Sequence, residues 1–167
     1  MKVVIISDIH DNAVNLKKVL DFCAREKIET IICCGDLGSA ETLKYLSDNF
    51  SGTIHLAFGN ADWSWEKEYA ALGKHKDILF YKDFGEAEIG QKKVAFVHYP
   101  KMAKELCQSG KYGFVFHGHT HKPWEENTGQ CKILNPGNVA GTFYAPTFAV
   151  WETNSDKFSL IRVHELK

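Results

Sequence analysis

Val3-Val4-Ile5-Ile6, followed directly by Ser7-Asp8-Ile9-His10, is the stretch that decides the fold. A continuous run of β-branched residues is typical of a strand that is buried on both faces, as in a parallel sheet. The polar residues after it end the strand, and Asp11 or Asn12 can cap a following helix. An apolar stripe along that helix is formed by Val14, Leu16, Val19, Leu20 and Cys23. The stretch therefore predicts a β-strand, a polar loop and an amphipathic helix, in that order.

The same alternation of strand and helix repeats further along the chain. Residues 30–34 and 53–58 are two more apolar runs of strand length. Residues 40–49 between them have helical periodicity, with Leu43 and Leu46 facing inward. Strands that alternate with helices predict a parallel sheet with right-handed crossovers.

The second half of the chain has the pattern of shorter strands. Residues 84–89 and 93–98 alternate around Gly90-Gln91, which predicts an antiparallel hairpin. A short helix is expected at 101–108, after Pro100. Further strands are expected at 113–116, 124–127, 130–134, 147–152 and 157–164. We predict one α/β domain over residues 1–167, with two sheets between helical layers.

Composition excludes several classes of protein. The 20 Lys and Arg residues nearly balance 21 Asp and Glu residues, so the net charge of −1 gives no strong signature of nucleic-acid or membrane binding. Arg25 and Arg162 are the only arginines, so positive charge for an anionic substrate would come from lysines or bound metal. No apolar stretch approaches the length that spans a bilayer.

The cysteines give an expectation about redox state. The five residues are Cys23, Cys33, Cys34, Cys107 and Cys131. Their number is odd, no Cys-x-x-Cys occurs, and no basic-then-apolar signal pattern is present. We therefore expect reduced thiols and a cytoplasmic location.

Phe116-His117-Gly118-His119-Thr120-His121 carries three of the eight histidines. Neutral imidazole is the commonest side-chain metal ligand, and residues two apart in an extended segment point to the same side. The apolar run at 112–116 reads as a short buried strand, and Pro123 prevents continuation as a helix. A strand is therefore expected to deliver His119 and His121 together to a metal.

Other polar residues also follow predicted strands. These are Asp8 and His10, Asp36, Asn60, and His98. Taken singly, Asp8 and Asp36 could cap helices, Asn60 could form a turn, and His98 could be an ordinary buried histidine. Because the carboxyl ends of strands are where sites form in α/β proteins, the whole set predicts one metal site.

The order Asp-x-His, Gly-Asp, Gly-Asn, His, Gly-His-x-His resembles the calcineurin-like metallophosphoesterases, and in detail their small single-domain YfcE-like branch. Asn135-Pro136-Gly137-Asn138 is close to the Asn-Pro-Gly-Ser turn of that branch. The resemblance implies a four-layer α/β/β/α sandwich and two metal ions. One ion would be bound by Asp8, His10 and His121, the other by Asn60, His98 and His119, with Asp36 bridging both.

The resemblance also implies an activity. Two metal ions would generate a hydroxide that attacks a small phosphate ester, most simply a phosphodiester, with Asp36, Asn60 and His98 in the catalytic centre. Oxygen and imidazole ligands without thiolate suit Mn²⁺, and also Zn²⁺, Fe or Ni²⁺. The retromer scaffold subunit keeps this fold but binds proteins. A weakly active scaffold or a regulatory metal-binding protein is therefore the alternative.

The sequence leaves the roles of four residues open, namely Asp62, Asn12, Trp63 and His117. Larger members of the family carry a histidine after Gly-Asn, thought to protonate the leaving group, whereas Ala61 stands here and Asp62 is the replacement acid to consider. Because the histidine is missing, we expect slow turnover and a preference for esters with good leaving groups. Asn12 can touch a phosphoryl oxygen or cap a helix. Trp63 can stack on a base or aryl ester, or pack a short helix onto the body or a second copy of the chain. His117 can orient a ligand, or simply bond to the backbone.

Overall fold

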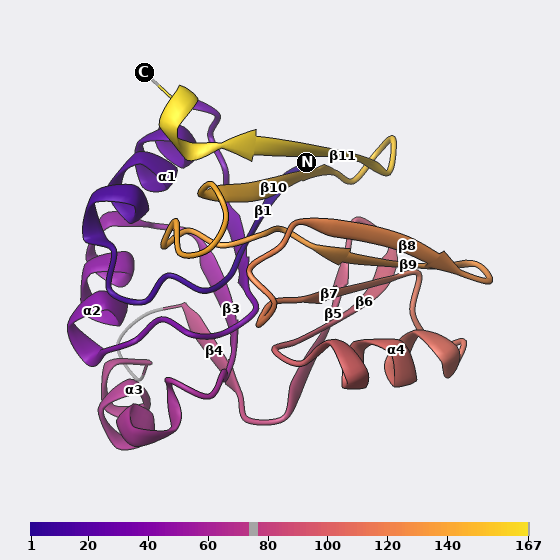
Figure 1. Ribbon diagram of the computed structural model, residues 1–167, viewed down its shortest axis with the longest axis horizontal. Helices are drawn as coiled ribbons and strands as arrows, with labels where there is room; N and C mark the ends of the chain where they lie inside the picture. Colours follow the sequence, from indigo (N-terminus) through magenta and orange to yellow (C-terminus); the bar gives the residue numbers. More distant parts are fainter. Residues whose placement is uncertain (74–76, 167) are drawn as a thin grey trace.

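The computed structural model describes residues 1–73 and 77–166. Two sheets lie face to face in the middle of the molecule, and helices cover the outer face of each (Figure 1). This is the four-layer α/β/β/α sandwich that the sequence predicts, and it confirms the fold class.

The first sheet has six strands in the order β11-β10-β1-β2-β3-β4. Its parallel part consists of β1 (Lys2–Ile6), β2 (Thr30–Cys33), β3 (Thr53–Ala57) and β4 (Ile78–Tyr81). Two antiparallel strands follow at the other edge, β10 (Thr147–Glu152) and β11 (Lys157–Arg162). The sequence patterns did not predict β4. Residues 163 and 164 were expected in the last strand but belong to a short 3₁₀ helix, Val163–Glu165.

Three helices cover the outer face of this sheet: α1 (Ala13–Arg25), α2 (Ala40–Asn49) and α3 (Glu66–Gly73). In α1 the buried side chains are Leu16, Val19, Leu20 and Cys23. Val14 was expected in this stripe but is 72% exposed. The reason is helical phase, since a residue two positions before Leu16 points about 200° away from it.

The second sheet has five strands in the order β5-β6-β7-β9-β8. They are β5 (Phe84–Ile89), β6 (Lys92–Val97), β7 (Phe114–His117), β8 (Trp124–Thr128) and β9 (Cys131–Asn135). The β5–β6 hairpin is antiparallel, as predicted, whereas β6, β7 and β9 run parallel. The helix α4 (Pro100–Gln108) covers the outer face (Figure 1).

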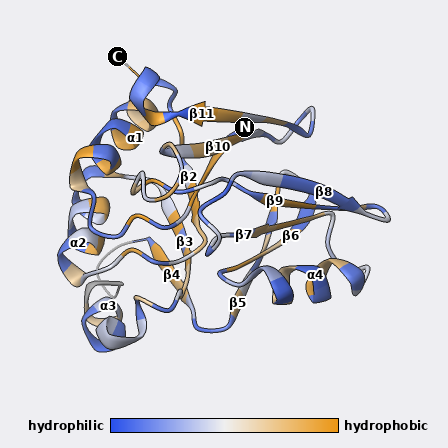
Figure 2. Cartoon of the chain, viewed as in Figure 1, coloured by the Kyte–Doolittle hydropathy of each residue, from blue (hydrophilic) through white to orange (hydrophobic). Residues whose placement is uncertain are grey.

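The core between the two sheets is built from alternate residues of the central strands. Ile5 of β1, Phe116 of β7 and Trp151 of β10 are all fully buried there. Helix α4 shows polar colours on its outer side and paler or apolar colours toward the second sheet (Figure 2). Helices cover one face of β1 and the second sheet covers the other. All its residues after Lys2 are therefore buried, which explains its unbroken apolar run.

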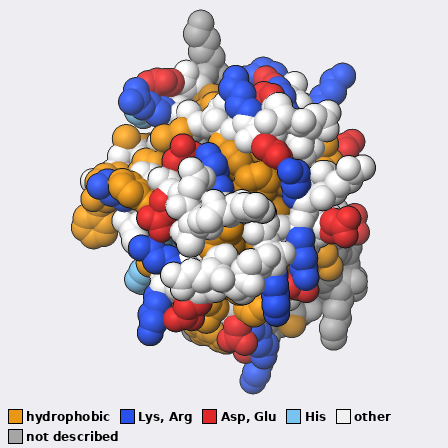
Figure 3. Space-filling view, turned by 90° about the vertical axis from the view of Figure 1, so that its right-hand side faces the viewer, with side chains coloured by type: hydrophobic (Ala, Val, Ile, Leu, Met, Phe, Trp, Pro, Cys, Tyr) orange, Lys and Arg blue, Asp and Glu red, His pale blue; other side chains and the backbone are white. Residues whose placement is uncertain are grey.

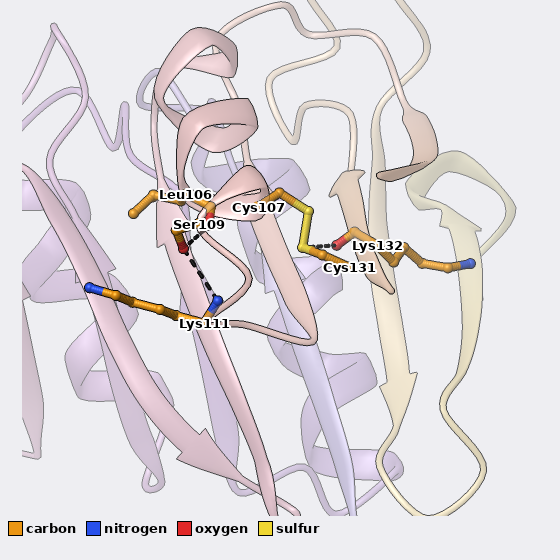
Figure 4. The surroundings of a disulfide bond; sticks show 6 residues. All are labelled: Leu106, Cys107, Ser109, Lys111, Cys131 and Lys132. Atoms are coloured by element: carbon orange, nitrogen blue, oxygen red, sulfur yellow. Dashed lines mark hydrogen bonds between the residues drawn. A yellow bond between two sulfur atoms is a disulfide. The ribbon is translucent and has the colours of Figure 1, made fainter. Parts of the chain in front are cut away.

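The cysteines require a correction. Cys107 of α4 and Cys131 at the start of β9 form a disulfide, with Cα atoms 5.6 Å apart (Figure 4). The expectation of reduced thiols is therefore wrong for this pair, because α4 packs directly on β9, a proximity that the sequence spacing does not reveal. Cys23, Cys33 and Cys34 are free and buried. The cytoplasmic location, which rested on reduced thiols, stays a prediction.

Within the described part of the chain, the helices lack the length and apolarity needed to cross a bilayer.

Figure 3 shows the side of the molecule away from α1–α3. Basic and acidic side chains are interspersed on that face rather than gathered by sign.

Candidate metal centre

The seven predicted ligands follow strands of both sheets. Asp8 and His10 come after β1, Asp36 after β2 and Asn60 after β3, all from the first sheet. His98 comes after β6, and His119 and His121 after β7, from the second sheet. The structure brings ligand atoms of both sets within hydrogen-bond distance of one another.

One group of ligand atoms is formed by Asp8, His10 and His121. The Nε2 atoms of His10 and His121 lie 3.3 Å apart, and Asp8 Oδ1 is 3.3 Å from His121 Nε2 and 3.9 Å from His10 Nε2. Nitrogen and oxygen ligands lie about 2.0–2.2 Å from Zn²⁺, so neighbouring ligands around one ion are roughly 3.0–3.5 Å apart. The spacing of this group is close to that of a coordination shell.

A second group surrounds the His98 imidazole. His98 Nε2 lies 3.4 Å from Asp36 Oδ2, 3.2 Å from Asn60 Oδ1 and 3.2 Å from His119 Nδ1. Asp36 Oδ2 is also 3.6 Å from His10 Nε2 in the first group. Asp36 therefore lies between the two groups, where a bridging carboxylate would have to be.

The Asp8 carboxylate shows that the donor set fits a cation. Asp8 is fully buried, and its Oδ1 has no hydrogen-bond partner among the described residues. Burial raises the pKa of the Asp8 carboxyl. A buried carboxylate oxygen without a partner is costly unless a cation or donor satisfies it. Its position facing two imidazole nitrogens points to a cation.

Asp36 and His98 stabilise each other's charge. Burial opposes the ionised form of Asp36, but the hydrogen bond and charge of His98 outweigh it and lower the pKa of that carboxyl. Burial likewise opposes the charged form of His98, but Asp36, with Asp8 and the Cys34 carbonyl, outweighs it, so the pKa of the imidazole is raised.

The backbone at the centre is strained. Five of the seven ligands have left-handed φ angles: Asp8 at 53°, His10 at 43°, Asp36 at 58°, His119 at 71° and His121 at 58°. This conformation costs non-glycine residues about 1–2 kcal/mol each. Such strain is concentrated at functional sites, where the surrounding structure holds it. No pattern in the sequence indicates it.

Glycines before the ligands allow close approach of the loops. A Cβ on Gly59 would lie 2.1 Å from Asp36 Oδ1, and a Cβ on Gly118 would lie 1.8 Å from Ser7 Oγ. Neither distance is sterically possible. The Gly-Asn and Gly-His pairs therefore have a packing reason as well as a chemical one.

Backbone carbonyls orient the two most buried of the histidine ligands. His98 Nδ1 is 2.8 Å from the Cys34 carbonyl, and His121 Nδ1 is 3.3 Å from the Thr142 carbonyl. A proton on each Nδ1 would donate to that carbonyl and leave Nε2 free for a metal. The sequence does not identify Cys34 or Thr142, because the backbone contributes the contact.

Two buried asparagines of the Asn-Pro-Gly-Asn turn hold the histidine loop. Asn135 Nδ2 donates to the Gly118 carbonyl, and Asn138 Nδ2 donates to the His121 carbonyl, each at 3.0 Å. The turn was predicted only as a family feature. Its role here is to position the backbone of residues 118–121.

Donors from the surrounding loops hold both oxygens of Asp62, and burial raises the pKa of its carboxyl. Its side chain is fully buried, and Oδ2 accepts from the amides of Asp36 and Gly59 at 2.7 and 2.8 Å. Oδ1 accepts from the Leu37 amide at 2.9 Å and from the Tyr69 hydroxyl at 3.2 Å. The structure thus gives Asp62 a structural role, tying together the loops that carry Asp36 and Asn60. The acid role of Asp62, which was the less favoured of its two possible roles, stays a prediction.

Three other expected residues are placed as follows. Asn12 is the N-cap of α1, accepting from the Asn15 amide at 3.0 Å and donating to the Ala140 carbonyl at 2.8 Å. His117 is 5% exposed and lies 3.0 Å from the Gly118 carbonyl, as expected for a backbone-bonded histidine. Trp63 is 44% exposed and packs edge-on against Phe58. Substrate contacts of Asn12 and Trp63 stay predictions.

Two exposed aromatic rings flank the centre and were not predicted. Tyr99 is 38% exposed, with its ring centroid 5.1 Å from those of both His98 and His119. Phe143 is 87% exposed, lies 5.7 Å from the His121 ring and has a φ of 66°. Tyr99 could have been noticed as the neighbour of His98, whereas nothing in the sequence singles out Phe143.

Comparison with known proteins identifies the family. A sequence model of the calcineurin-like phosphoesterase superfamily domain matches residues 1–156. The chain belongs to this superfamily. A curated member, the phosphodiesterase MJ0936 of Methanocaldococcus jannaschii, is 29% identical over 161 residues, which cover 95% of this chain and 96% of the relative. The resemblance inferred from the motifs is therefore confirmed.

Solved structures agree with the superfamily fold. A novel archaeal phosphodiesterase matches with a TM-score of 0.86 at 27% identity, over 97% of this chain and 99% of the other. The phosphoesterase YfcE of E. coli has a TM-score of 0.69 at 16% identity, over 98% and 100%. Vps29 of Entamoeba histolytica complexed with zinc has a TM-score of 0.69 at 20% identity, over 98% and 99%. The last two likenesses show the fold alone.

Proposed function

We propose that this calcineurin-like phosphoesterase is a dinuclear metal-dependent phosphodiesterase. The observation that carries the proposal is the place of Asp36, whose Oδ2 lies 3.6 Å from His10 Nε2 and 3.4 Å from His98 Nε2. One carboxylate thus faces a ligand nitrogen of each group. Two-metal hydrolytic sites hold their ions about 3.5–4 Å apart, a separation that a shared carboxylate can span.

Asp8, His10 and His121 would hold one ion, Asn60, His98 and His119 the other, and Asp36 both. Bound divalent ions, Mn²⁺ first among them, would supply an activated water and neutralise charge on the phosphoryl group. Asp8 and Asp36 are the only carboxylates in this ligand set, so the loaded centre stays positive and attracts an anion. The Asn60 amide adds a ligand without reducing that charge.

The chain's own residues also limit the substrate. Ala61 is half-buried beside the centre, and its amide donates to Asp36 Oδ1 at 2.8 Å. Its methyl side chain has no proton to give to a leaving oxygen. Asp62 accepts hydrogen bonds from five donors, which hold its carboxylate in place. Without a positioned acid to protonate the leaving oxygen, we expect esters with good leaving groups to react fastest. The phosphodiesterase relative supports a diester as the substrate class.

A binding role without turnover is the second candidate, favoured by the likeness to Vps29. A protein-binding scaffold has no need of five strained ligand residues or of the orphaned Asp8 oxygen. An assay of metal-free and Mn²⁺-loaded protein with a chromogenic phosphodiester separates the two. Hydrolysis that requires Mn²⁺ and is lost in Asp36→Asn supports the enzyme. A loaded wild type without hydrolysis supports the scaffold.

A further inference from the structure

A cavity of about 330 Å³ lies between α4 and β8, beside the loop that carries His119 and His121. We call it the Trp124 cavity. Its polar and aromatic walls include Lys104, Thr120, Lys122, Trp124, Tyr144 and one carboxylate, Glu126, which pairs with Lys104. Its volume is at the lower end of the range of small-molecule sites, about 300–1,000 Å³.

The buried histidine in its wall has an unused nitrogen. His117 is 5% exposed, and its Nδ1 lies 3.0 Å from the Gly118 carbonyl. In the described part of the chain, Nε2 has no hydrogen-bond partner. With the proton on Nδ1, Nε2 is an acceptor available to a hydroxyl or amino group of a ligand. His117 lines the cavity, so a hydroxyl or amino group of an occupant would supply the matching donor.

One lysine of the cavity also lacks a partner. Lys104 is 3.5 Å from Glu126, whereas Lys122 has no carboxylate within 4 Å among residues 1–73 and 77–166. Lys122 Nζ instead lies 5.7 Å from the centre of the Trp124 ring, which is 53% exposed. An exposed indole with an unpaired cation beside it suits a ligand that has both a flat ring and a negative charge.

The cavity shares walls with the metal centre. Thr120 lies between two of the ligands, and Asn138 donates to the carbonyls of both His121 and Tyr144, at 3.0 and 3.4 Å. Pro100 lines the cavity next to Tyr99, whose ring packs against His119. The loop of residues 118–121 and the start of α4 thus border both the metal centre and the cavity.

We propose that the Trp124 cavity binds a nucleotide portion of the diester, its base against Trp124 and Tyr144 and its second anionic group at Lys122. This proposal rests on the proposed phosphodiesterase function and names its substrate class. Base stacking on aromatic rings tolerates all four bases, so we expect selection for nucleotides without strong base preference.

The test begins with binding in the absence of metal. Metal-free protein in EDTA is titrated with adenosine 5′-monophosphate by calorimetry. We expect saturable binding that weakens at least fivefold in Trp124→Ala and in Lys122→Ala. Phe84→Ala is the matched control, since Phe84 is an exposed aromatic residue of the same sheet but lies outside the cavity. Absence of binding, or a loss in Phe84→Ala without a loss in Trp124→Ala, would overturn the proposal.

A second arm uses turnover with Mn²⁺. Trp124→Ala should lower kcat/KM for the 4-nitrophenyl ester of thymidine 5′-monophosphate at least fivefold, while methyl 4-nitrophenyl phosphate is hydrolysed as by the wild type. Equal loss on both esters would contradict a nucleotide site. If the wild type hydrolyses neither ester, the proposed function fails, and the binding titration still decides whether the cavity takes a nucleotide.

Discussion

The Asp8 carboxylate and the His121 imidazole face each other across 3.3 Å, although they follow strands of different sheets. The second group of ligands is divided in the same way, with Asp36 from the first sheet and His98 from the second. A cation bound here would therefore connect the two sheets. Its positive charge would also compensate the buried carboxylates of Asp8 and Asp36.

Metal binding should stabilise the protein measurably. A ligand that binds only the folded state at 100 times its Kd adds about 2.7 kcal/mol, or roughly 5–10 °C in Tm for a chain of this size. We expect Mn²⁺ or Zn²⁺ to produce this shift in calorimetry and EDTA to reverse it. Asp8→Asn should remove most of the shift and leave the metal-free protein at least as stable as the wild type, because a buried charge is lost. An unchanged shift in that variant would argue against Asp8 as a ligand.

Ala61→His should restore help to the leaving group. The Ala61 amide bonds to Asp36, so a side chain at this position is held beside the centre. A positioned general acid contributes about 10²–10⁴-fold, and we expect the substitution to recover up to about 10²-fold on esters with poor leaving groups. Rates for a series of aryl esters check this, with Ala61→Gln as a control of similar size. A gain that is equal for good and poor leaving groups would refute the proton-donor explanation.

Asp62→Asn should impair stability rather than chemistry. Five donors point at the Asp62 carboxylate, and an amide NH₂ would oppose some of them. The cost should be about 2–4 kcal/mol in the free energy of unfolding, measured with urea. Asp83→Asn, at an exposed position, should change it by less than about 0.5 kcal/mol. A stable Asp62→Asn protein with a changed pH–rate profile would instead restore its role as an acid.

His55 should make the protein less stable in mild acid. Burial lowers the pKa of His55 on β3, whose Nδ1 lies 3.1 Å from the Tyr81 hydroxyl. The unfolded chain binds a proton at this histidine below pH about 6.5, and the folded chain does so only at lower pH. This stabilising contribution is therefore present above pH 6.5 and is lost as the pH falls through the folded pKa. Urea unfolding from pH 8 to 5 should show a smaller loss for His55→Gln than for the wild type; parallel curves would show that His55 does not contribute.

The sequence predicted the features of the fold and of the site that depend on local residue patterns. The buried run of β1 and the strand-end positions of Asp36 and His98 follow from hydrophobic periodicity and from where α/β sites form. What the patterns missed depends on tertiary contact. The disulfide needed the packing of α4 on β9, and Asp62 needed two loops to meet around it. The edge strand β4 is the exception, because Ile78-Leu79-Phe80-Tyr81 is an apolar run of strand length that the prediction overlooked.

The most direct test of the central claim is a metal titration followed by turnover. Metal-free protein, at a concentration well above the Kd for Mn²⁺, receives increasing Mn²⁺ while hydrolysis of bis(4-nitrophenyl) phosphate is recorded. A dinuclear centre predicts that the rate rises until two equivalents are bound per chain and then levels, and that Asp36→Asn stays inactive throughout. A rate that levels at one equivalent, or no hydrolysis at any loading, would contradict the dinuclear phosphodiesterase.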